Sequence, residues 1–145
     1  MMQLETALAT VERKSEHFLE VRFKHGAFID LPGVLAVQQA RERLCPGGGC
    51  VVLTLVPPDI GFERGLMQTE MYRPNEGQRH ALAEAIVTPG NLHHMIGLLY
   101  VSLFPRSFRI EVFSSEASAR AWLAGRLKEA GFVPDGDPSP PALRT

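Results

Sequence analysis

The fold is decided by one stretch of the chain, Cys50-Val51-Val52-Leu53-Thr54-Leu55-Val56. The stretch is apolar throughout except at Thr54, and it has the length of a strand. Such a run is typical of a strand that is covered on both faces, as strands are in a parallel sheet. We therefore expect it to be a central strand of the protein.

An amphipathic helix is predicted just before this strand. Asp30 can cap its free amide groups, Pro32 is tolerated in its first turn, and Cys45-Pro46 ends it. The glycines at 47–49 then turn the chain. The predicted inward stripe is Leu35, Ala36, Ala40 and Leu44, and the predicted outward face is Gln38, Gln39, Arg41, Glu42 and Arg43.

A β-hairpin is predicted near the N-terminus. Two short runs, residues 6–11 and 18–23, are separated by the polar stretch 12–16. In the second run, Leu19 and Val21 alternate with charged residues, so one face of the strand is apolar and the other is solvated.

Strands and helices also alternate after the central strand. Residues 81–87 form an apolar run of strand length, and residues 91–104 carry a helical apolar stripe after a turn. Residues 108–112 alternate as a last strand. Segment 62–79 has mixed signals and is predicted to contain a short helix at best. Segment 134–145 has four prolines and almost no apolar side chains, so we expect a mobile tail.

A final helix is predicted after Ser114-Ser115-Glu116. Gly131 can take the left-handed conformation, so Phe132 can fold back on Leu127 as in a Schellman cap. The side chains expected to point inward are Ala119, Trp122, Leu123 and Leu127.

This order predicts the α/β class, with a mixed, mostly parallel five-stranded sheet, an N-terminal hairpin and about four helices. The length of 145 residues and the 45% of hydrophobic residues fit one domain, over residues 1–133, followed by the tail. A net charge of -1 gives no field that would attract nucleic acid. No apolar run is long enough to cross a membrane and no signal peptide is evident, so we expect a cytoplasmic protein.

The two cysteines, Cys45 and Cys50, flank Pro46-Gly47-Gly48-Gly49. They are too few for a four-thiolate zinc site. We interpret them as structural thiols in a loop between helix and strand, because a reducing cytosol disfavours a standing disulfide. A redox pair is the alternative.

No metal, cofactor or catalytic set is predicted. His93 and His94 are adjacent and cannot easily share one ion, with or without His80. The glycines at 47–49 follow a helix and precede a strand, which is the wrong order for a phosphate-binding loop. Glu84 is expected at the surface end of its strand, where Arg79, Arg109 or His80 could pair with it. We therefore expect a protein that is not an enzyme.

The helix predicted at 91–104 is apolar almost all round. Beyond its core stripe it carries Gly97, Leu98, Tyr100 and Val101. A helix of this kind is covered on both sides, here by segment 62–72, by a second subunit or by an apolar ligand. We expect a homodimer, with an apolar ligand as the lesser alternative.

The order of elements resembles the STAS domain, named for sulphate transporters and anti-sigma-factor antagonists, and most closely its stand-alone bacterial members. The resemblance covers about residues 6–127. It is carried by Ile29-Asp30-Leu31 before a helix, by 81–87 before a turn and helix, and by 108–123, which ends in Trp122-Leu123. It implies a non-enzymatic binding or regulatory module that acts through protein contacts.

The resemblance also directs attention to the turn Asp59-Ile60-Gly61. Regulatory members of the family carry a phosphorylated Ser in this turn, whereas Ile60 has no hydroxyl that could accept a phosphoryl group. Asp59 could act as a fixed negative charge at a helix N-terminus, or simply as a turn residue. The alternative function is a small carrier of a lipid or other apolar ligand, because the fold also broadly resembles the lipid-transfer CRAL-TRIO domains.

Overall fold

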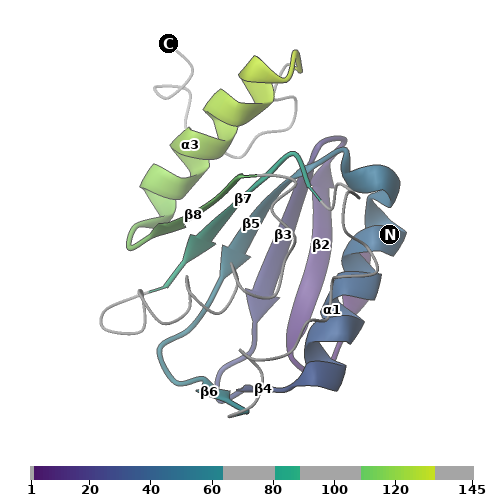
Figure 1. Ribbon diagram of the computed structural model, residues 1–145, viewed down its shortest axis with the longest axis vertical. Coiled ribbons are helices and arrows are strands. Elements are labelled where there is room, and N and C mark those ends of the chain that lie inside the picture. The colour runs from purple at the N-terminus through teal and green to yellow at the C-terminus, as the bar shows by residue number, and fades with distance from the viewer. Residues whose placement is uncertain (1, 64–80, 89–108, 133–145) are drawn as a thin grey trace.

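The computed structural model describes residues 2–63, 81–88 and 109–132. Among these residues the centre is a six-stranded sheet, and Figure 1 labels its strands β2, β3, β5, β7 and β8. The strand order is β1-β2-β3-β5-β7-β8. The first three strands pair antiparallel, and β3, β5, β7 and β8 pair parallel. The strand bounds are Gln3–Glu5 for β1, Ala9–Ser15 for β2, Phe18–Phe23 for β3, Val51–Leu55 for β5, Ala83–Val87 for β7 and Arg109–Phe113 for β8.

The α/β class is confirmed, and β5 lies between β3 and β7 as its apolar sequence predicts. The sheet has six strands where five were expected, because β1 adds an edge beside β2. The stretch 12–15, expected in a loop, belongs to β2. It stays extended although it is polar, because its charged side chains pair along the sheet, as Glu12 does with Lys14 and Arg22.

Among the described residues, two α-helices cover opposite faces of the sheet. Helix α1, Leu31–Leu44, contacts β1 and β2, and helix α3, Glu116–Glu129, contacts β5, β7 and β8 (Figure 1). Neighbouring residues of one strand enter different cores: Leu19 and Val52 face α1, whereas Phe18 and Val51 face α3. Both faces of β5 are therefore dry.

Helix α1 begins where the sequence predicts. It is rotated about its own axis, so the face that it turns toward the sheet differs from the predicted one. Asp30 caps it by accepting a hydrogen bond from Gly33 N at 2.9 Å. Gly33 meets Leu8 so closely that a Cβ there would lie 2.4 Å from Leu8 Cδ1. This contact brings Arg41 onto the inward face and leaves Leu35 41% exposed, so both predictions were wrong. The buried residues of the helix are Gly33, Val34, Val37, Ala40, Arg41 and Leu44.

Helix α3 has the predicted ends. The Ser115 side chain accepts a hydrogen bond from Ser118 N, and Gly131 has a φ of 90°. Phe132 N donates to Leu127 O and Gly131 N donates to Lys128 O, which is the hydrogen-bond pair of a Schellman motif.

A short parallel pair lies beyond the carboxyl ends of β3 and β5. It joins β4, Phe28–Ile29, to β6, Gly61–Phe62. A 3-10 turn, η1, spans Pro46–Gly48 between α1 and β5. The helices predicted at 62–79 and 91–104 and the tail at 134–145 lie outside the described residues, apart from Phe62 and Glu63, so the expected number of helices is not tested.

Candidate functional site

The turn that contains Asp59 lies where β3 and β5 end. Carboxyl ends of parallel strands meet at the same edge of a sheet, and here they bring His25, just after β3, to Asp59. The Nδ1 atom of His25 is 3.5 Å from Asp59 Oδ1, and both side chains are exposed. His25 was missed from the sequence because its position beside Asp59 depends on the β3–β5 pairing.

Two apolar contacts attach the turn 59–61 to the rest of the protein. Ile60 is half-buried and packs against the core on the α1 side of the sheet. Gly61 pairs with Phe28, and a Cβ on Gly61 would lie 3.1 Å from the Phe28 ring. The ring itself is 55% exposed. Position 60 therefore lacks a hydroxyl and also serves as an anchor for the turn.

Asp59 is a turn residue, and the element that follows it is strand β6. The alternative expectation, a charge at a helix N-terminus, is wrong. The nearby helix start, that of α1, receives other carboxylates: Asp30 accepts from Gly33 N, and Glu63 accepts from Leu31 N at 3.4 Å. The Asp59 carboxylate is left facing His25 and solvent.

A buried polar cluster lies between α1 and the sheet. Glu84 is 0% exposed, with Arg41 Nη1 at 3.1 Å from its Oε1 and the Thr54 hydroxyl donating to its Oε2 at 2.6 Å. The predicted surface position of Glu84 was wrong. The partner of Glu84 is Arg41, which the rotation of α1 brings inward. Of the expected partners, Arg109 lies 3.6 Å from Glu111 instead, and Arg79 and His80 lie outside the described residues.

A second buried carboxylate, Glu20, lies on the opposite face of the sheet. It is 4% exposed although its face was expected to be solvated. Arg22 Nη1 lies 2.5 Å from one carboxylate oxygen, and Arg120 Nη2 from α3 lies 3.3 Å from the other. The hydrogen bond to Glu20 raises the pKa of the Arg22 guanidinium above its usual value. The cluster ties α3 to β3.

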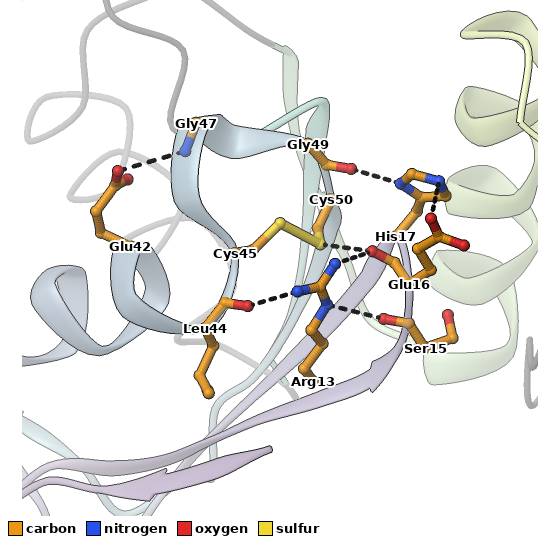
Figure 2. The surroundings of a disulfide bond; sticks show 10 residues. All are labelled: Arg13, Ser15, Glu16, His17, Glu42, Leu44, Cys45, Gly47, Gly49 and Cys50. Atoms are coloured by element: carbon orange, nitrogen blue, oxygen red, sulfur yellow. Dashed lines mark hydrogen bonds and ion pairs between the residues drawn. A yellow bond between two sulfur atoms is a disulfide. The ribbon is translucent and has the colours of Figure 1, made fainter. Parts of the chain in front are cut away.

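Cys45 and Cys50 are joined by a disulfide with a Cα–Cα distance of 6.5 Å (Figure 2). Their interpretation as two free thiols was therefore wrong. The bond links the end of α1 to the start of β5 across the glycine turn, where Gly47 and Gly48 have φ values of 79° and 69°. Because the turn folds back on itself, the two cysteines come within bonding distance.

Two side chains from the β2–β3 region surround this disulfide (Figure 2). The Arg13 guanidinium donates to the carbonyl oxygens of Leu44, Ser15 and Glu16. The Nδ1 atom of His17 donates to Gly49 O at 2.9 Å. Neither residue was singled out from the sequence, because their contacts with the junction, Arg13 with Leu44 O and His17 with Gly49 O, join residues more than 30 positions apart.

Several predicted site residues lie outside the described residues. These are Gly97, Leu98, Tyr100 and Val101. His80, His93 and His94, which are not expected to bind a metal, also lie outside the described residues. In the part of the chain that the structure describes, no cluster of three or more potential metal ligands is present. Among the same residues, no helix has the length and apolarity that crossing a membrane requires.

A comparison of the chain with protein-family models, curated proteins and solved structures found no match. The residues of the chain itself therefore carry the functional argument. The described surface feature that sequence and structure both single out is the turn at 59–61, with His25 beside it.

Proposed function

We propose that the chain is a non-enzymatic, STAS-like binding or regulatory module of the cytoplasm that acts through protein contacts at the turn 59–61. The single observation that carries this proposal is the exposed, anchored carboxylate of Asp59. Ile60 packs below it, and Gly61 pairs with Phe28 beside it. A charge held on a rigid turn costs little entropy to bind, which favours recognition by a partner.

The chemistry of this surface suits a partner with a basic and an apolar group. Asp59 supplies a fixed negative charge without phosphorylation, and the exposed ring of Phe28 lies against the same turn. His25 lies beside the Asp59 carboxylate on the same surface. We infer that this module binds its partner constitutively at position 59, rather than through a phosphorylated hydroxyl.

The proposal predicts that Asp59→Lys weakens partner binding by about tenfold or more without unfolding the protein. Tagged wild-type protein and the variant are incubated with lysate of the source cell, cross-linked, and the captured proteins are quantified by mass spectrometry. Recovery of the partner is expected to fall by about tenfold or more, since a charge reversal at the centre of a contact costs at least about 1.4 kcal/mol.

Glu129→Lys is the matched control, because Glu129 is a carboxylate of similar exposure, 62% against 52% for Asp59, with one surface ion pair on α3. Its captured proteins are expected to equal those of the wild type. If no protein is lost specifically with Asp59→Lys, the turn is not a docking surface and the proposal fails.

A further inference from the structure

We propose that the Cys45–Cys50 bond is a reversible dithiol–disulfide switch, and that its reduction loosens the junction of α1 with β5 and the distant end of α3. The two cysteines are 5% and 1% exposed, whereas Pro46 and Gly47 in the turn between them are exposed, so a reductant would approach the bond from this turn. This regulation is independent of the docking surface proposed above.

We expect the domain to stay folded when the Cys45–Cys50 disulfide is reduced. The disulfide spans a sequence separation of 5, and a cross-link over so short a loop constrains the unfolded chain much less than one over a long loop. Arg13 holds the same junction without sulfur, since its Nη1 donates to Leu44 O at 2.9 Å and the rest of its guanidinium binds two carbonyl groups of the β2–β3 turn. Reduction therefore relaxes the junction instead of unfolding the domain.

An acceptor for the reduced form is already in place. The Sγ atom of Cys50 lies 3.5 Å from the carbonyl oxygen of Glu16, the same oxygen that Arg13 binds (Figure 2). A disulfide sulfur has no proton to donate, whereas a thiol has one. Both redox states of Cys50 thus find a suitable environment at this position.

The reductant is a dithiol, which supplies two electrons and two protons. After the turn opens, one of its thiolates attacks Sγ of Cys45, which forms a mixed disulfide and releases Cys50 as a thiolate that takes up a proton. The second thiol of the reductant then closes its own disulfide and releases Cys45 as a thiol. Cys45 is the sulfur attacked, because the exposed residues Pro46 and Gly47 follow it, whereas Cys50 precedes the buried Val51.

His17 connects this bond to α3. Its Nδ1 binds Gly49 O, and its ring stacks on Phe132 with the ring centroids 3.9 Å apart and the planes at 28°. Phe132 completes the Schellman motif that ends α3. When the turn 46–49 is released, His17 loses its fixed acceptor and Phe132 loses a fixed stacking partner.

The test compares amide hydrogen exchange of the full chain in oxidised glutathione and in reduced dithiothreitol. In the reduced state, the hydrogen-bonded amides of Cys45, Gly48 and Val51 and that of Phe132 are expected to exchange roughly tenfold faster or more. The amides of β7 are expected to stay unchanged, and reoxidation is expected to restore all rates. A Cys45→Ser, Cys50→Ser variant should show the fast rates under both conditions.

His17→Phe separates the two halves of the proposal, because it keeps a ring against Phe132 and removes the hydrogen bond to Gly49. In this variant, reduction is still expected to speed amide exchange at residues 45–51. It is expected to have no effect on amide exchange at Phe132. The switch is overturned if reduction proceeds only with global unfolding, if exchange is the same in both states, or if oxidised glutathione fails to form the bond. An unresponsive Phe132 in the wild type overturns the connection to α3.

Discussion

Two carboxylates, Glu20 and Glu84, are almost fully buried among the described residues. A buried charge is tolerated only when it is paired and hydrogen-bonded. Glu84 meets this requirement with Arg41 and Thr54, and Glu20 meets it with two arginines, one of them from α3. Each of these glutamates therefore attaches a helix to the sheet at a defined position.

Glu84→Gln is expected to lower the free energy of unfolding by about 3 kcal/mol, because it removes the carboxylate that faces Arg41 in a dry environment. Urea denaturation followed by circular dichroism measures the change. Replacing the pair by apolar side chains, Glu84→Leu with Arg41→Met, is expected to restore most of this loss.

The control for this prediction is Glu111→Gln on the adjacent strand β8. Glu111 forms an exposed ion pair with Arg109, so its loss is expected to cost less than about 1 kcal/mol. Equal unfolding midpoints for Glu84→Gln and the wild type would show that the buried pair does not attach α1 to the sheet.

At the scale of elements, the ends of the helices follow local chemistry, whereas their rotation does not. Asp30, Ser115 and Gly131 act where the sequence predicts, because a cap interacts with amide or carbonyl groups three to five residues away. The inward face of α1 depends instead on its contact with Leu8 before β2. That contact exchanges the predicted positions of Leu35 and Arg41.

Two glycines in helices test whether tertiary contacts decide the effect of a substitution. Replacing each by Ala is expected to change the stability with opposite sign. Gly33→Ala is expected to destabilise the protein by about 2 kcal/mol, because the new Cβ would clash with Leu8 and with the Asp30 oxygen that caps the helix. Gly125→Ala in α3 has nothing within 4 Å and is expected to stabilise by about 0.5 to 1 kcal/mol. Thermal unfolding of the two variants measures both changes, and equal signs would contradict this account.

At the scale of the whole molecule, we expect residues 91–104, which lie outside the described residues, to form the contact between two copies of the chain. The apolar character of residues 91–104 predicts a homodimer, so Leu98→Glu is expected to yield a folded monomer. Light scattering coupled to size-exclusion chromatography gives the mass, and circular dichroism checks the fold. An unchanged mass would contradict the dimer.

Native mass spectrometry of the same samples separates the dimer from the alternative, a carrier of an apolar ligand. If the protein is a carrier, the wild type is expected to be a monomer that retains apolar small molecules. The Leu98→Glu variant is expected to be a monomer as well and to have lost these molecules. A wild-type protein that is dimeric and free of such molecules would exclude the carrier.

The sequence by itself determined the α/β class, the central place of β5, the ends of α1 and α3 and the turn at Asp59. These features depend on neighbouring residues, through apolar periodicity, capping groups and glycine conformation. The tertiary structure alone decided the Glu84–Arg41 pair, the contact of Glu20 with Arg120 and the Cys45–Cys50 bond. The first two join residues far apart in the chain, so they depend on how helices rotate on the sheet, and the third depends on how a glycine turn folds back, which a linear pattern does not encode.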